Sequence, residues 1–300
     1  MKWRYRGKLG FGYYNNRSRW FSLGPTPTVW IEVLPMIPLV RLRAFWIAGL
    51  CVGSALSMKA EDGWALISSL QFNDARGAFT DADQSDPRNR LGLGVALLGS
   101  QPKTEANLAR AETIFRELRD ADTSSDIGVR AGFFLARIAH LHRQPSRWTE
   151  AAELYRATYD AAPTHPIGQR ALVHWGIVTL LRTTNAESVR EELERFKTQT
   201  AEFTDEGAAR DAHWVLMDFY ERKLDDKAAT LREIEAVLTS PVPLRDVTRF
   251  GLLIQAAELS RLLGNTERAL GHFRAFVAQA TRDSRIFLVK ERVAELEASQ

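Results

Sequence analysis

The chain reads AAELYRATYDAAP over residues 151–163 and ARGAFTDADQSDP over residues 75–87. Each stretch begins with an alanine, carries an aromatic residue four positions later, and ends at a proline twelve positions after the alanine. Residues four and seven positions apart lie on one face of a helix, and a proline ends the helix. The spacing therefore predicts a helix whose buried face places a small residue beside a large one.

The same spacing returns along most of the chain. In chain order, the leading residues of the units are Ala75, Ala111, Ala151, Val189, Ala229 and Ala269. The intervals between them are 36, 40, 38, 40 and 40 residues, which total 194 over five steps and average about 39. Only the unit led by Ala229 lacks a large apolar residue one turn later, because Glu233 stands there. A period in this range predicts stacked helical hairpins.

A second series of positions precedes the first by twelve residues. Four of these positions are small and two are large, namely Gly63, Gly99, Ala139 and Ala257 against Ile177 and Met217. Two helices approach closely only where both present little side chain. We therefore expect each unit to be an antiparallel hairpin, with the aromatic residue filling the space against the next hairpin.

This pattern resembles the tetratricopeptide repeat (TPR) family, whose units read W-x2-L-G-x2-Y, then A-x3-F, then P. The best matches are Leu98-Gly99 with Ala111 and Phe115, and Ile138-Ala139 with Ala151, Tyr155 and Pro163. The tryptophan position holds other residues, and the period exceeds the family's length of about 34 residues. A HEAT-like array of similar period is the alternative.

The resemblance implies an all-α, right-handed solenoid of antiparallel hairpins over residues 61–300. We expect about six repeats, because six leading positions follow one another. The final stretch, Ile286 to Glu297, carries its charged residues on an otherwise apolar helix. It is expected to cap the last hairpin with a polar outer face, as a terminal helix in a solenoid requires.

Residues 36–57 have the layout of a secretory signal peptide. Arg41 and Arg43 precede an uncharged apolar stretch from Ala44 to Leu56, and small residues follow it. Cleavage is expected near residue 57 or residue 60. The sequence thus predicts an exported bacterial protein of the periplasm or cell envelope. If the segment is not cleaved, it is an N-terminal anchor that holds the protein on the membrane.

Charge is distributed unevenly about this segment. Residues 1–57 hold eight Lys or Arg and one acidic residue, a net charge of +7, so the whole-chain charge of +3 leaves −4 for the remainder. Residues 1–35 are basic without periodicity, and we interpret them as an over-called start or a disordered leader. Because the basic balance belongs to the leader, no nucleic-acid partner is expected. Cys51 is the only cysteine, so no disulfide can form within the chain.

The sequence contains no recognisable catalytic motif. Gly92-Leu93-Gly94 and Gly99-Ser100 superficially match a phosphate-binding loop, but no strand signal precedes them and no lysine follows the last glycine. His140 and His142 are two residues apart and so point to different sides of a helix. No acidic residue or cysteine completes a metal-binding set with them. We therefore expect no enzyme activity, no metal and no cofactor.

The resemblance implies that the first helix of each hairpin lines a groove that holds a peptide. The matching face of one unit is expected to comprise Phe133, His140 and Arg143. Another unit spaces its residues by three, four and three, at Asp211, Trp214, Asp218 and Glu221. An indole among carboxylates suits a basic peptide. Alternatively, Trp214 packs against the neighbouring hairpin and the acids are only solvated.

These features favour a non-catalytic protein–protein interaction scaffold of the cell envelope, with a protein or peptide partner that is basic if the Trp214 face binds it. One alternative is a membrane-tethered assembly factor of the envelope, which requires an uncleaved leader. Another is an enzyme accessory protein whose site is assembled from distant residues. The oligomeric state is left open.

Overall fold

The computed structural model describes residues 62–299. The chain divides into two units, Met1–Gly49 and Leu50–Gln300, and every described residue lies in the second. The predicted basic leader and signal peptide lie outside the described residues. Within residues 62–299 the regular structure is helical throughout and contains no strand, as predicted.

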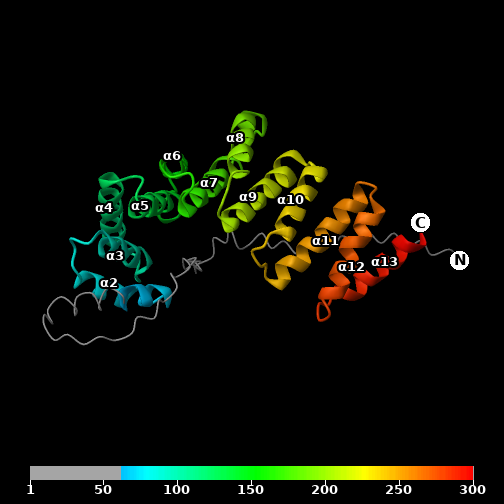
Figure 1. Cartoon of the computed structure of the whole chain (residues 1–300), viewed down its shortest axis with the longest axis horizontal. Helices are drawn as coiled ribbons and strands as arrows, with labels where there is room; N and C mark the ends of the chain where they lie inside the picture. The colour runs from blue at the N-terminus through cyan, green and yellow to red at the C-terminus, as the bar shows by residue number, and fades with distance from the viewer. Residues whose placement is uncertain (1–61, 300) are drawn as a thin grey trace, which may run out of the picture. The chain divides into compact units, whose positions relative to one another are not determined.

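Helices follow one another with short connections (Figure 1). A helix at residues 62–68 comes first. The helices after it are α2 (Phe72–Thr80), α3 (Pro87–Gly99), α4 (Glu105–Ala121), α5 (Asp126–Arg137), α6 (Trp148–Ala161), α7 (Pro166–Thr179), α8 (Arg190–Thr200), α9 (Glu206–Phe219), α10 (Lys227–Thr239), α11 (Asp246–Leu262), α12 (Thr266–Gln279) and α13 (Ile286–Ala298). The shorter elements are the π-helices η2 (Ile138–His142) and η4 (Tyr220–Leu224) and the 3-10 helix η3 (Glu187–Val189).

The helices pair in chain order into six hairpins over the described residues, and α13 follows the sixth. Most second helices also pack against the first helix of the next hairpin, as α4 does with α5 and α6 with α7, whereas α8 makes no comparable contact with α9. This sequential packing is that of a TPR-like solenoid, so the expected fold class and about six repeats are confirmed. Its right-handedness stays a prediction.

First and second helices form separate layers. First helices contact one another directly, α3 with α5, α5 with α7, and α7 with α9. Second helices are linked by side chains, because Arg156 Nη1 on α6 donates to Gln199 Oε1 on α8 at 2.9 Å. On α12, Arg268 Nε donates to Glu235 Oε1 on α10 at 2.6 Å. The first-helix layer is therefore a continuous surface built from several repeats.

The predicted pairing of small and large residues forms the core. The ring of Phe79 on α2 lies against Gly63 of its own hairpin and Gly92 of the next. A Cβ built on Gly92 would lie 2.3 Å from Phe79 Cζ, far inside van der Waals contact. Five leading alanines have no exposed surface, namely Ala75, Ala111, Ala151, Ala229 and Ala269. The repeat register is thus confirmed by burial.

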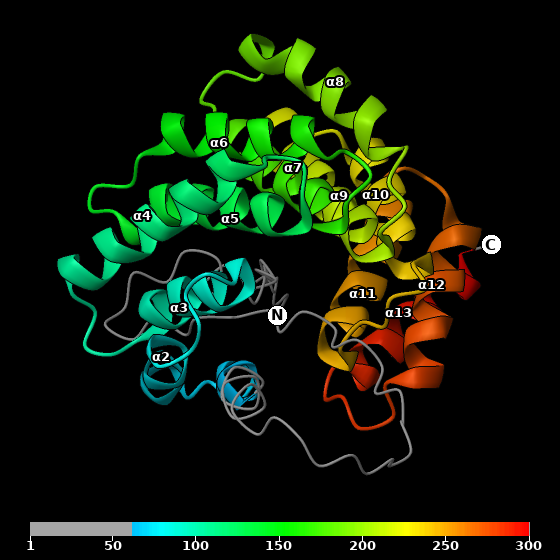
Figure 2. The same ribbon diagram turned by 60° about the vertical axis from the view of Figure 1, so that its left-hand side comes forward.

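The two helices of the α7–α8 hairpin pack less extensively on each other than those of the α5–α6 and α9–α10 hairpins. Ile177 and Val189 occupy its two close-approach positions, where most other hairpins have small residues. The backbones of α7 and α8 approach each other at fewer positions than those of α5–α6 or α9–α10, and α7 packs more extensively on α9. Figure 2 shows α8 beyond α6 and α7, at the margin of the stack.

The capping helix α13 differs in part from expectation. Val289 is buried and packs with Phe273 and Phe276 of α12, so α13 does cover the last hairpin. However, the side chains of Phe287 and Leu288 in its first turn are 78% and 49% exposed. The charged residues that make an outer face polar lie only after this turn. The expected polar outer face is therefore wrong for the start of α13.

Candidate functional site

Three residues of the predicted acidic face lie on α9. The side chain of Asp205 accepts a hydrogen bond from the backbone N–H of Ala208 at 2.7 Å, which fixes the start of this helix. Trp214 is half-buried and packs against a cluster of buried residues that includes Met217 and Leu231. One part of its indole is therefore packed in the core, and another part lies at the surface.

The carboxylates of this face have basic neighbours. Arg210 Nη2 donates to Asp211 Oδ1 at 2.7 Å, and Arg222 Nη2 lies 3.2 Å from Asp218 Oδ1. Asp211 and Asp218 thus each have an arginine on α9 or on the next element. The surface is consequently less negative than the positions of its acids alone indicate.

Glu221 belongs to the π-helix η4 and not to α9. A π-helix has more residues per turn than an α-helix, so Glu221 departs from the even helical spacing that placed it beside Asp218. Its Oε1 accepts a hydrogen bond from Gln255 Nε2 of α11 at 3.3 Å. Glu221 therefore joins the first helices of two successive hairpins.

Of the predicted group of Phe133, His140 and Arg143, only Arg143 lies apart from the other two. Arg143 follows the π-helix η2 with an extended backbone, and its guanidinium pairs with Glu105, at 2.9 Å, and with Glu112. Both acids belong to the second helix α4, whereas His140 is buried beside Tyr155 of α6. The wider turn of η2 and the end of the helix separate side chains that an uninterrupted α-helix would bring together.

His140 belongs to an aromatic cluster between the third and fourth hairpins. Its Nδ1 lies 3.3 Å from the Tyr155 hydroxyl, and the Tyr155 ring stacks on His174 of α7 with ring centroids 5.2 Å apart. The Phe133 ring lies 5.3 Å from that of His174. Trp148 completes the cluster, with its ring 4.9 Å from that of His140.

Both histidines of this cluster are held in the neutral form. Burial, together with the charges of Arg137 and Arg182, lowers the pKa of His140 to about 4. Burial likewise lowers the pKa of His174 to about 3, with Arg137 the next contributor. His174 Nδ1 is buried and has no hydrogen-bond partner. At neutral pH the two rings therefore act as packing residues and not as ligands of a peptide acid.

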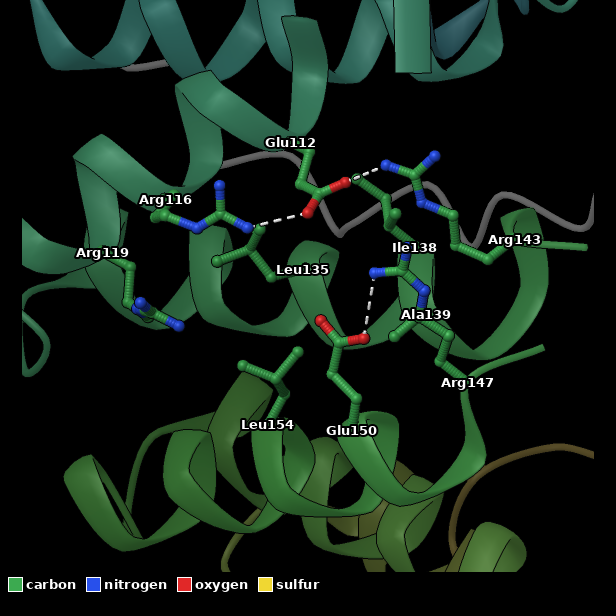
Figure 3. A pocket seen from close by; sticks show the side chains of 10 residues that line it. All are labelled: Glu112, Arg116, Arg119, Leu135, Ile138, Ala139, Arg143, Arg147, Glu150 and Leu154. Atoms are coloured by element: carbon green, nitrogen blue, oxygen red, sulfur yellow. Dashed lines mark hydrogen bonds and ion pairs between the residues drawn. The ribbon is translucent and has the colours of Figure 1, made fainter. Parts of the chain in front are cut away.

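A small pocket opens between the second helices α4 and α6, over the end of the first helix α5 (Figure 3). Its volume is about 130 Å³. It is lined by Glu112, Arg116, Arg119, Leu135, Ile138, Ala139, Arg143, Arg147, Glu150 and Leu154, and we call it the arginine pocket. Of these residues the sequence alone singles out only Arg143. The pairs Arg116/Arg119 and Arg143/Arg147 are spaced by three and four residues, which is the one signal that indicates the pocket.

Glu112 organises the arginine pocket. Its carboxylate accepts hydrogen bonds from Arg143 and, at 2.7 Å, from Arg116. Burial raises the pKa of Glu112, but the hydrogen bonds from the two arginines outweigh burial, and the net pKa lies below the usual value. Across the opening, Arg147 Nη1 donates to Glu150 Oε2 at 3.2 Å. Arg143 Nε is buried without a hydrogen-bond partner.

Residues 62–299 contain no group of three or more His, Cys, Asp or Glu side chains placed to hold a metal ion. In the same part of the chain, every helix is too short or too polar to cross a membrane.

Solved structures include chains that are similar to this protein. No protein-family model matches the sequence, and no curated protein matches it significantly. The crystal structure of a tetratricopeptide repeat protein from Parabacteroides merdae is similar, with 14% sequence identity and a TM-score of 0.34 over 82% of this chain and 100% of the other. Values this low do not align individual residues, so the TPR-like fold is assigned from the hairpin packing described above.

Proposed function

We propose that this protein is a non-catalytic protein–protein interaction scaffold of the cell envelope. The observation that most directly supports this proposal is the continuous layer of first helices from α3 to α9. The hydrogen bond between Glu221 and Gln255 extends this layer to α11. Solenoids use such multi-repeat surfaces to bind extended or helical segments of a partner. The predicted signal peptide supports the envelope location.

The Trp214 face is the proposed peptide contact. Half-buried aromatic residues are frequent binding hot spots, because they are rigid and bring a large area into contact. Asp211 and Asp218 flank Trp214, and their ion pairs with Arg210 and Arg222 are only partly buried, so each pair contributes little free energy. A lysine or arginine of a partner can therefore replace those pairs, so the partner is proposed to be basic.

Titration of the purified protein with basic peptides tests this proposal. Trp214→Ala is expected to weaken binding by about 2 kcal/mol or more, as truncation of a hot spot does. Asp218→Lys should remove the salt-sensitive part of the affinity, since it reverses a charge at the contact. Glu194→Lys is the matched control, because Glu194 also pairs with a basic residue of its own helix, Lys197, but on α8. Circular dichroism melts report whether each variant is folded.

Two results would contradict the proposed contact. Equal affinity of Trp214→Ala and the parent protein would place the peptide elsewhere on the solenoid. A melting temperature that collapses in Trp214→Ala alone would show that the indole is a core residue, as the alternative from sequence has it.

One rival function has specific support. The uncharged stretch from Ala44 to Leu56, if it is not cleaved, would tether the repeat domain as a membrane-bound assembly factor. Fractionation of the host cell separates the two, because a tethered protein stays with the membranes after salt washing and a periplasmic one does not.

A further inference from the structure

We propose that the arginine pocket binds an acidic side chain of a partner protein, together with an aliphatic residue beside it. The pocket lies among the second helices α4 and α6, whereas Trp214 lies on the first helix α9. It is therefore a separate site with the opposite charge preference, and it does not depend on the proposed Trp214 contact.

The pocket lining has more hydrogen-bond donors than acceptors. Four arginines and two glutamates line it, a formal charge of 4 − 2 = +2. Each guanidinium has five N–H donors and no acceptor, so Glu112 and Glu150 cannot satisfy all four arginines. One of the unused donors, Nε of Arg143, is buried. An additional carboxylate is the group that this lining lacks.

The other acids around the pocket are weakly held. Glu105 pairs with Arg143 from outside the lining, and its side chain is 83% exposed. Asp120 pairs with its neighbour Arg119 and is also exposed. Exposed ion pairs of this kind contribute about 0–1 kcal/mol. A partner's carboxylate can thus take their place without a large penalty.

One ion pair in the wall of the pocket is held in place before any ligand arrives. Glu112 and Arg143 form an ion pair in which both side chains are mostly buried, and Glu112 also holds Arg116. Figure 3 shows Arg116 and Arg119 on one side of the opening and Arg143 and Arg147 on the other. Guanidinium groups held in place bind carboxylates with two parallel hydrogen bonds, which are roughly twice as strong as neutral ones.

The size and the apolar part of the pocket define the rest of the guest. Leu135, Ile138 and Leu154 lie between the two arginine pairs. The volume of about 130 Å³ is below the range of about 300–1,000 Å³ for pockets that enclose small-molecule ligands. The pocket therefore fits a side chain presented by a larger partner better than a free metabolite, and Leu154, the partly exposed apolar residue of the lining, suits an aliphatic neighbour of the acid.

A pair of peptides tests the proposal on the purified protein. The first carries Glu-Leu in a short neutral context with a neutral dye, and its twin carries Gln-Leu. Fluorescence anisotropy is expected to show saturable binding of the Glu peptide only, weakened by added salt. In the double variant Arg116→Gln/Arg147→Gln the affinity for the Glu peptide should fall at least tenfold.

The matched control is Arg190→Gln/Arg274→Gln, which removes two exposed, ion-paired arginines elsewhere in the solenoid. It should bind like the parent protein, and thermal melts should show all variants folded. Equal binding of the two peptides, no binding of the Glu peptide, or equal losses in both double variants would overturn the proposal. Inorganic phosphate is used as a competitor. If phosphate binds as tightly as the Glu peptide, and if its affinity also depends on Arg116 and Arg147, the pocket is a site for small anions and the proposed partner side chain is wrong.

Discussion

At the scale of single residues, the histidines of the aromatic cluster show how burial decides protonation. His140 and His174 lie among aromatic rings, and their nearest charged groups are Arg137, Arg170 and Arg182. All of these groups are positive or neutral, so no negative charge in the cluster stabilises a protonated imidazole. The guanidinium of Arg182 lies 3.8 Å from the centroid of the Trp148 ring. The cluster is thus stable only while both imidazoles are neutral.

This arrangement predicts loss of stability on acidification. The pKa values of His140 and His174, about 4 and about 3, lie below the ordinary value of 6.5. Between pH 6.5 and those values the unfolded chain binds more protons than the folded one. The free energy of unfolding therefore falls as pH decreases, by up to about 1.4 kcal/mol per pH unit for each histidine.

Urea unfolding at a series of pH values measures this slope. His174→Phe keeps a ring against Tyr155 but cannot titrate, so its slope below neutral pH should be shallower than that of the parent protein. Tyr155→Phe is the control, because it removes the hydroxyl contact to His140 without removing a group that titrates in this range. Parallel curves for the parent protein and His174→Phe would mean that His174 titrates normally in the folded state.

At the scale of elements, the hairpin contact depends on small residues that meet at fixed positions. Ala139 in η2 and Ala151 in α6 belong to the same buried cluster, and Ala151 has no exposed surface. The α7–α8 hairpin, with Ile177 and Val189 at these positions, has its helices further apart. The contact at Ala139 and Ala151 therefore leaves no room for a larger side chain.

A bulky residue at the contact should therefore destabilise the hairpin. Ala151→Trp is expected to lower the free energy of unfolding by about 1–3 kcal/mol through overpacking. Ala157→Trp is the matched control on the same helix, since Ala157 is exposed and should change stability by no more than about 0.5 kcal/mol. Denaturant titration measures both. Equal stability of the two variants would show that the repeat register is incorrect.

The sequence predicts the hairpins well because their contacts depend on residue size at a regular spacing. Each leading alanine and its aromatic neighbour carry that information locally, as Ala75 and Phe79 do. The candidate site is predicted less well, because η2 and η4 have no recognisable sequence signal and each changes the helical register. Arg143 and Glu221 lie directly after or in these π-helices, and both depart from the faces expected for them.

The arginine pocket could not be found from spacing alone either. Its lining comes from α4, α5, η2, α6 and the segment before α6, so it forms only when successive repeats stack. Long side chains add a second difficulty. Arg143 reaches Glu112, which is 31 positions earlier in the chain, and a helical pattern gives no indication of that direction.

At the scale of the whole molecule, the predicted leader determines where the scaffold works. Residues 62–299 form the repeat domain, and the charge of −4 calculated for the chain after residue 57 leaves the basic residues of the leader outside it. A cleaved leader gives a mildly acidic repeat domain in the envelope. An uncleaved leader adds a basic segment and an apolar anchor to the same domain.

Expression in its own host is expected to yield a mature protein that begins near Met58 or Glu61, because small residues and a short apolar stretch precede both positions. Mass spectrometry of the intact protein measures this, since removal of the leader is a loss of nearly sixty residues. Leu50→Arg should block maturation by placing a charge in the apolar stretch, whereas Leu262→Arg, on the exposed surface of α11, should not. Detection of Met1 or Met36 as the first residue of the mature protein would establish the anchored form, and Leu50→Arg would then release the repeat domain from the membrane instead of preventing cleavage.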